Sequence, residues 1–327
     1  MALATDMTSE RIVAVMGTTA HVIVEGSNQL IDGAVARLHE LEARWSRFRP
    51  DSEISRLNAL PGLPVVVSND TFGLVERAIA GWRLTNGLFD PTLLRELRDA
   101  GYDRSFELIG ASSPAPNRPV AASVSSSPHG GRGDRLGVTI DAVVRSVTLQ
   151  PGVEIDPGGI GKGLAADLVV EELLAAGARG AMVSIGGDLR AEGDAPGGEG
   201  WVVAVADPLD PDRGIATLVL DAGAVASTWR TKRAWTSDDG AARHHVLDPR
   251  TGRPAATGVA GVTVVAGRGW HAEVLAKAAF LAGSAAAGPL VRGANGAALV
   301  IDDDGTCRQL GDLAPFLSVT ATEGART

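Results

Sequence analysis

The 327-residue sequence has a single cysteine, Cys307, few aromatic residues (4%) and more acidic than basic side chains. One cysteine excludes a disulfide framework and a cluster of thiolate metal ligands. The formal net charge of −9 argues against a nucleic-acid partner, because proteins that bind nucleic acids usually carry a basic face. No apolar run approaches the roughly 18 residues that a membrane-spanning helix requires.

The N-terminal stretch, MALATDMTSERIVAVMGTTAHVIVEG, has no basic start followed by an apolar core. No secretory signal is therefore predicted, and we expect a cytoplasmic protein. Hydrophobic residues make up 45% of the chain, which is ample material for a core. The length suits one large domain or two ordinary ones.

Hydrophobic spacing predicts helices over residues 30–48, 71–87, 166–178 and 271–283. Apolar β-type runs predict a strand and a turn at 180–193, and strands at 201–208, 215–228, 261–267 and 297–305. Residues 11–26 are predicted as one strand that bends at Gly17. Helices combined with strands in hairpin-like pairs are typical of the α+β class, with largely antiparallel sheets.

Residues 111–135, ASSPAPNRPVAASVSSSPHGGRGDR, are rich in serine, proline, glycine and alanine. Such a composition can bury little apolar surface, so this segment is predicted to be a flexible insertion. Strand signals resume directly after it, at residues 136–152. We therefore expect one domain over residues 1–327 that carries the insertion.

Residues 154–168, EIDPGGIGKGLAADL, join a strand ending at Asp156 to a glycine-rich turn, Lys162 and the start of a helix. Backbone N–H groups at such a turn attract negative charge, so the stretch suits an anionic ligand. Its spacing matches neither a Walker loop nor GxGxxG. An ordinary strand-to-helix turn with a surface lysine is an equally good explanation of this stretch alone.

Three further stretches concentrate polar residues beside turns: FDPT at 89–92, SIGGDL at 184–189 and HHVLDPRTGRP at 244–254. Each has a structural explanation. An Asp–Pro–Thr sequence commonly begins a helix, with Asp or Thr as the cap. DPRTG can form an ordinary turn that Asp248 caps.

In chain order, seven stretches together resemble the FAD:protein FMN transferase family (ApbE-like proteins), from Met16 to about Gly283. They are MGTT at 16–19, FRPDSEISRLN at 48–58, GLFDPT at 87–92, DPGGIGKGLAAD at 156–167, SIGGDL at 184–189, HHVLDPRTGRP at 244–254 and AEVLAKAAFLAG at 272–283. The resemblance implies a T-fold-like α+β architecture of antiparallel sheets with packed helices. It also implies the family's reaction, in which Mg²⁺ assists transfer of FMN from FAD through a phosphoester bond to a Ser or Thr of a target flavoprotein, with release of AMP.

The resemblance also implies residue roles. The positions that match flavin- and nucleotide-binding residues of the family are Met16, Phe48, Leu88, Phe89, Asp90, Asp156, Lys162 and Leu247. Asp156 is expected to contact the nucleotide, and Lys162 to approach the diphosphate or ribose. His245 and Asp248 match the histidine and aspartate of the family's HIIDP motif. His245 is the candidate to relay the proton of the acceptor hydroxyl, because imidazole titrates near neutrality.

The implied metal site departs from the family pattern. The family binds Mg²⁺ through an aspartate, a threonine four residues later and a backbone carbonyl, positions that match Glu273, Lys277 and Gly159 here. Glutamate can ligate a hard cation, but an ammonium only donates. Whether this chain binds Mg²⁺ is therefore left open. Either the charge of Lys277 takes the place of the metal, or Glu273 and Lys277 form a helix-surface ion pair.

A second departure lies in STWRTKRAW, residues 227–235, where Trp229 replaces a glycine of the family pattern. The cations Arg230, Lys232 and Arg233 are predicted to contact phosphate or to line a solvated edge strand. The leading functional prediction is an FMN transferase whose partners are FAD and a flavin-acceptor protein. A non-catalytic FAD-binding protein, and a hydrolase that cleaves FAD to FMN and AMP, are the alternatives.

Overall fold

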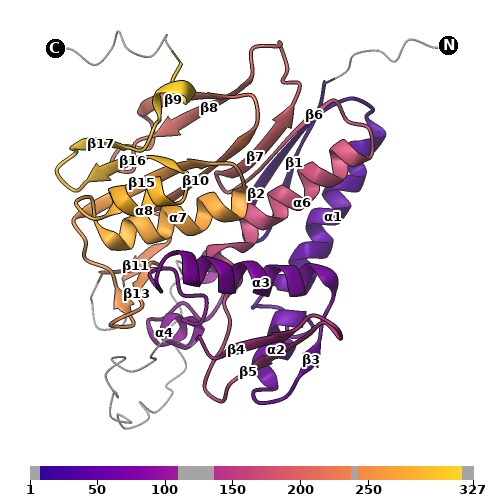
Figure 1. Ribbon diagram of the computed structural model, residues 1–327, viewed down its shortest axis with the longest axis vertical. Coiled ribbons are helices and arrows are strands. Elements are labelled where there is room, and N and C mark those ends of the chain that lie inside the picture. The colour runs from indigo at the N-terminus through magenta and orange to yellow at the C-terminus, as the bar shows by residue number, and fades with distance from the viewer. Residues whose placement is uncertain (1–7, 110–135, 237–241, 319–327) are drawn as a thin grey trace. The chain divides into compact units, whose positions relative to one another are not determined.

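The computed structural model describes residues 8–109, 136–236 and 242–318 (Figure 1). The chain divides into two compact units. Unit 1 comprises Met1–Arg44, Gly158–Trp229 and Thr257–Thr327, and unit 2 comprises Trp45–Pro157 and Arg230–Ala256. A single domain over residues 1–327 stays a prediction, and the insertion predicted at 111–135 lies outside the described residues.

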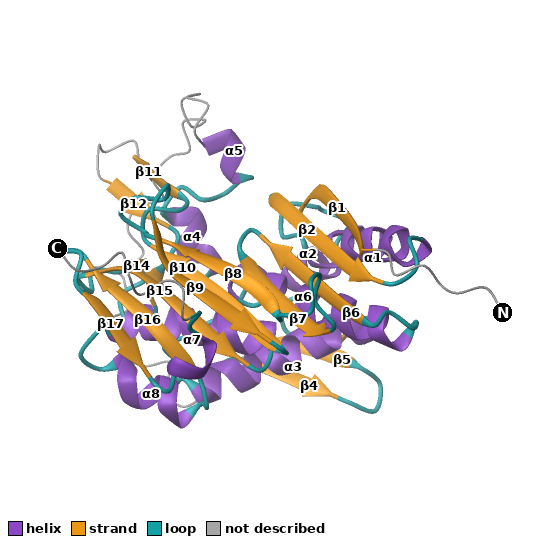
Figure 2. Cartoon of the chain, turned by 90° about the horizontal axis from the view of Figure 1, so that it is seen from above, coloured by secondary structure: helices purple, strands orange, loops and turns teal. Residues whose placement is uncertain are grey.

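An eight-stranded sheet in the order β1-β2-β6-β7-β10-β15-β16-β17 is the frame of unit 1 (Figure 2). All of its pairings are antiparallel. Its strands are β1 (Thr8–Val15), β2 (Thr18–Glu25), β6 (Gly180–Ile185), β7 (Asp188–Gly193), β10 (Gly223–Trp229), β15 (Val259–Ala266), β16 (Ala297–Asp302) and β17 (Cys307–Leu310).

Two long helices cover one face of this sheet. Helix α6 (Gly161–Ala175) packs on β6 and β7, helix α7 (Gly269–Ala282) packs on β10 and β15, and the two helices contact each other (Figure 1). Helix α7 is apolar almost all round, as expected for a helix buried between a sheet and neighbouring helices. The described part of unit 1 also contains helices α1 (Gln29–Trp45) and α8 (Ala287–Gly293).

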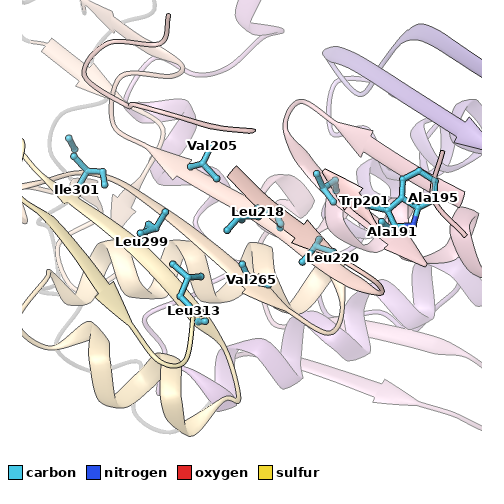
Figure 3. Close-up of a cluster of buried hydrophobic side chains, with 14 residues drawn as sticks. Ala191, Ala195, Trp201, Val205, Leu218, Leu220, Val265, Leu299, Ile301 and Leu313 are labelled. Carbon is cyan, nitrogen blue, oxygen red and sulfur yellow. The ribbon is translucent and has the colours of Figure 1, made fainter. Parts of the chain in front are cut away.

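The other face of the sheet is covered by a hairpin of β8 (Trp201–Ala206) and β9 (Gly214–Leu220). Trp201 and Leu218 from the hairpin join Ala191, Val265 and Leu299 from the sheet in one buried apolar cluster (Figure 3). Because successive strand side chains point to opposite faces, the sheet contributes one set of residues to this cluster and another to the helices. Unit 1 therefore has three layers.

Residues 11–26 form a hairpin, so the prediction of one bent strand was wrong. Strands β1 and β2 pair along their full lengths, and Met16 and Gly17 occupy the turn between them. Both turn residues have positive φ, 54° and 63°, as a two-residue type I′ turn requires. The chain consequently reverses at Gly17. The Met16 N–H donates to Glu42 Oε1 at 2.7 Å.

Unit 2 consists of one long helix, three short helices and small antiparallel sheets in its described residues. The helices are α2 (Glu53–Ala59), α3 (Asn69–Leu84), α4 (Leu94–Asp99) and α5 (Phe106–Ile109). The sheets are β3-β5-β4 (Val65–Val66, Ser146–Leu149, Val138–Asp141), β11-β12 (Ala234–Thr236, Ala242–His244) and β13-β14 (Leu247–Asp248, Arg253–Pro254). Ser52 and Ser68 cap α2 and α3 through their side-chain oxygens.

The α+β prediction is confirmed, as are the predicted helices that correspond to α1 and α3. The helix predicted from residue 166 begins earlier, at Gly161, so Lys162 lies in its first turn. Glycines normally weaken a helix, which is why the sequence indicated a turn here. The structure gives a reason for Gly163, since a Cβ there would lie 2.3 Å from the carbonyl oxygen of Gly269.

Candidate functional site

In unit 1, Lys162 lies between two buried carboxylates. Its Nζ donates to Asp188 Oδ2 in a short contact and to Glu273 Oε1 at 2.9 Å. Asp188 is 4% exposed and Glu273 is 2% exposed. Burial opposes the charge of the ammonium, but the two carboxylates outweigh it and raise the pKa of Lys162 above its ordinary value of 10.5. Lys162 is therefore a fixed cation at neutral pH.

Asp188 connects this lysine to the sheet. It begins β7 directly after the turn at Gly186 and Gly187, and its Oδ1 accepts the Ser227 N–H at 3.1 Å. The Ser227 hydroxyl bonds in turn to Thr263 across β10 and β15, at 2.8 Å. Asp188 was not among the predicted site residues, although an acid after a glycine pair in SIGGDL was a usable signal.

Glu273 joins helices α6 and α7. Its second oxygen, Oε2, accepts the Gly163 N–H in the first turn of α6 at 2.9 Å. Asp167 in α6 makes the reverse connection: Oδ1 accepts the Gly269 N–H at 2.7 Å and Oδ2 accepts the Trp270 N–H at 3.0 Å. Each helix thus supplies a carboxylate for N–H groups in the first turn of the other, groups that have no partner within their own helix.

The two helices meet at a glycine pair. A Cβ on Gly269 would lie 2.4 Å from the Gly163 carbonyl oxygen, so neither position has room for a larger residue. Burial raises the pKa of Asp167 to about 6, although its bonds to Gly269 and Trp270 and the nearby Arg190 act to lower it. The crossing therefore contains an acid that titrates near neutrality.

The residues implied as a magnesium site do not fit a divalent cation. Both oxygens of Glu273 already accept hydrogen bonds, from Lys162 and Gly163, and Lys277 offers only donors. Gly159 ends a 3₁₀ turn, Pro157–Gly159, just before α6. Among the described residues, no group of three or more His, Cys, Asp and Glu side chains could hold a metal ion. The alternative prediction, an ion pair of Glu273 and Lys277 on the helix surface, does not fit either, because Glu273 is buried.

In unit 2, Asp156 lies beside Arg47, a cation that was not among the predicted site residues. Arg47 Nε is 3.4 Å from Asp156 Oδ1. The Arg47 guanidinium also lies over the rings of Phe48 and Tyr102, 4.2 and 4.5 Å from their centroids, and donates to the Tyr102 carbonyl at 3.0 Å. Phe48 is 40% exposed. Asp156 therefore adjoins a partly open aromatic surface, and the position of Arg47 directly before Phe48 was the available signal.

The FDPT stretch is a fixed turn in unit 2. Asp90 Oδ1 accepts the N–H and the hydroxyl of Thr92 at 2.8 and 2.6 Å. Phe89 is buried and its N–H donates to Thr85 Oγ1 at 3.0 Å, while Leu88 is half-buried. Asp90 does not cap a helix, because α4 begins only at Leu94.

The HHVLDPRTGRP stretch, residues 244–254, also lies in unit 2. Asp248 Oδ1 accepts the Arg250 N–H at 2.9 Å, and Asp248 Oδ2 accepts from Arg250 Nη2 at 2.7 Å, which lowers the pKa of Asp248. Asp248 thus holds the DPRTG turn, as its structural explanation predicted. His245 follows β12 and is half-buried, and Leu247 is buried in a cluster that includes Tyr102. The catalytic roles of His245 and Asp248 stay predictions.

The basic stretch after β10 is a loop. Trp229 ends β10 opposite Gly261, whose missing side chain leaves room for the indole, since a Cβ there would lie 2.9 Å from it. Arg230, Lys232 and Arg233 follow in the connection to β11, so the edge-strand alternative was wrong. Arg233 donates to the Tyr102 hydroxyl at 3.0 Å.

The fold places the chain in the structural class of the ApbE proteins. The ApbE protein of Thermotoga maritima matches with a TM-score of 0.82 and 27% identity, over 95% of this chain and all of that one. The flavin transferase ApbE from Vibrio cholerae matches with a TM-score of 0.77 and 25% identity, over 95% of this chain and 99% of that one.

The sequence comparisons agree. The FAD:protein FMN transferase of Treponema pallidum is 31% identical over 75% of this chain and 69% of that protein. The FAD:protein FMN transferase of Haemophilus influenzae is 28% identical over 82% of this chain and 79% of that protein. The model of the ApbE family matches residues 16–301, and the chain belongs to this family. No helix among the described residues is both long and apolar enough to cross a bilayer.

Proposed function

We propose that this chain is an FAD:protein FMN transferase, which moves FMN from FAD to a Ser or Thr hydroxyl of a target flavoprotein and releases AMP. The observation that carries this proposal is the family match over residues 16–301, together with relatives of that name that align with three quarters or more of the chain. It is a transferase reaction, with FAD as a substrate.

The transfer exchanges one P–O bond for another. The acceptor oxygen forms a bond to the phosphorus on the FMN side of the diphosphate, and the bond from that phosphorus to the bridging oxygen breaks. AMP leaves with the bridging oxygen. We assign the hydroxyl proton to His245, because an imidazole can accept a proton at neutral pH. Asp248 is proposed to position the loop that carries His245, through the turn that it holds.

Positive charge must offset the diphosphate during this exchange. Lys277 in α7 is the proposed source in unit 1, because Asp188 and Glu273 already offset the charge of Lys162. Lys162 remains a proposed contact of the diphosphate or ribose. Because Glu273 and Lys277 do not fit a divalent cation, no step is assigned to Mg²⁺. The proposed flavin- and nucleotide-binding residues remain Met16, Phe48, Leu88, Phe89, Asp90, Asp156 and Leu247.

Product analysis tests the proposal and separates its alternatives. The full chain would be incubated with FAD and an acceptor flavoprotein with a single modifiable threonine, validated with another flavin transferase. Covalent FMN on the acceptor with an equal amount of AMP supports the transferase. Free FMN and AMP would identify a hydrolase, and bound but unchanged FAD a non-catalytic binding protein. A cytoplasmic location and the absence of a nucleic-acid partner stay predictions.

A further inference from the structure

The crossing of α6 and α7 is built from two equivalent halves. In α6, Asp167 lies four residues after Gly163, and in α7, Glu273 lies four residues after Gly269. Each acid accepts the N–H of the glycine in the opposite helix, at 2.7 and 2.9 Å. The two glycines leave room for no Cβ at the contact. Glu273 is thus the counterpart of Asp167 in a reciprocal pair of caps.

In this arrangement both oxygens of Glu273 have a hydrogen-bond donor. One oxygen accepts from Gly163 and the other from the Lys162 ammonium, and the side chain is almost completely buried. A divalent cation at Glu273 would have to share these buried oxygens with the Gly163 N–H and lie close to the Lys162 ammonium, which repels it. It would also meet Lys277, one helical turn further along the same face of α7, whose ammonium repels it.

We propose that Glu273 is a structural cap in this chain and that FAD binds without a divalent cation at Glu273. The Lys162 ammonium is then the cation that pairs with Glu273 and Asp188, and Lys277 on α7 adds a second positive charge. The proposal rests on the proposed function for its choice of FAD as the ligand. It concerns the cation requirement, which the family match leaves open for this chain.

Manganese binding tests the proposal directly on the wild-type protein. The full chain, stripped with EDTA and desalted, would be titrated with Mn²⁺, with and without FAD, while electron paramagnetic resonance reports free Mn²⁺. Fluorescence titration would give FAD affinity in EDTA and in millimolar Mg²⁺. We expect no stoichiometric Mn²⁺ site and FAD affinities within about twofold of each other. One equivalent of tightly bound Mn²⁺, or an FAD affinity at least tenfold weaker in EDTA, would overturn the proposal if the Mn²⁺ binding or the EDTA effect is lost in Glu273→Gln. If it persists in Glu273→Gln, the metal binds elsewhere and the proposal about Glu273 stands.

Two matched variants separate a cap from a metal ligand. Glu273→Gln keeps an oxygen for the Gly163 N–H but loses the charge that pairs with Lys162. Glu171→Gln removes an exposed acid of the same helix layer, one that pairs with Arg268. We expect Glu273→Gln to lower the melting temperature by several degrees and Glu171→Gln to change it little, with Mn²⁺ binding the same in both variants and wild type. Loss of Mn²⁺ binding in Glu273→Gln alone would contradict the cap.

The inference and the proposed function fail in different ways. If FMN is transferred only with Mg²⁺ and Mn²⁺ binds through Glu273, the inference is wrong and the transferase stands. If FAD binds equally well in EDTA but no acceptor is modified under any condition, the transferase is wrong and the inference about Glu273 stands.

Discussion

Replacing Asp167 by asparagine is a sharp test of the crossing between α6 and α7. Asparagine has nearly the same shape and keeps one oxygen that can accept from the N–H groups of Gly269 and Trp270, which donate to the two oxygens of Asp167 in the wild type. It cannot ionise. The variant therefore removes the proton equilibrium of residue 167 while most of the packing is retained.

The magnitude follows from the raised pKa. Burial raises the pKa of Asp167 from its ordinary value of 3.8 to about 6. Because the folded protein holds this proton more tightly than the unfolded chain does, the stabilising contribution is complete below pH 3.8 and is lost as the pH rises through about 6. At roughly 1.4 kcal/mol per pH unit, the loss amounts to about 3 kcal/mol. The hydrogen bond that asparagine cannot make costs about 1 kcal/mol at every pH.

Urea unfolding of wild type and Asp167→Asn, followed by tryptophan fluorescence at several pH values from 4 to 7.5, measures this effect. Other titrating groups are common to both proteins and cancel in the difference. We expect the wild type to lose about 3 kcal/mol relative to the variant over this range, mostly between pH 4 and 6. A difference in unfolding free energy that is constant with pH would refute the account of Asp167 as a buried, ionising cap.

Four further predictions concern the α6–α7 crossing in unit 1 and Asp156 in unit 2. Gly163→Ala should lower stability by about 1–3 kcal/mol through overpacking against α7, and an unchanged melting temperature would show that the helices can separate freely. Lys162→Met should cost about 3–5 kcal/mol, because two buried carboxylates lose their cation; chemical denaturation measures this, and a neutral effect would count against the ion pairs. Asp156→Ala should weaken FAD binding, and equal affinity in a fluorescence titration would remove that residue from the nucleotide site. Glu273→Asp combined with Lys277→Thr should create Mn²⁺ binding, and its absence in electron paramagnetic resonance would mean that these two side chains do not decide metal use.

Much of the fold could be predicted because periodicity is a local property. Helices α1 and α3 show the helical spacing of apolar residues that a single buried face produces. The β1–β2 hairpin escaped notice because its turn contains Met16, where Asn-Gly or Asp-Gly is the usual signal. The start of α6 escaped notice because Gly163 reads locally as a helix breaker. Its reason lies in a second helix that is distant in the sequence.

Some residues of the candidate site could be singled out from the sequence, but their contacts could not. Motifs singled out Lys162 and Glu273, yet nothing in the sequence shows that residues 111 positions apart form an ion pair. The same holds for Asp167, which looked like an ordinary helix residue and in fact caps α7. Such partners follow from the crossing of two helices, and the sequence alone does not specify that crossing.

The most direct test of the central claim is fragment mass analysis of the acceptor protein after incubation with FAD and this chain. We predict one FMN attached through its phosphate to a single Ser or Thr, with no modification when that residue is alanine or when FAD is replaced by FMN. An acceptor that stays unmodified, while a second flavin transferase modifies the same preparation, would contradict the assignment of this chain as an FMN transferase.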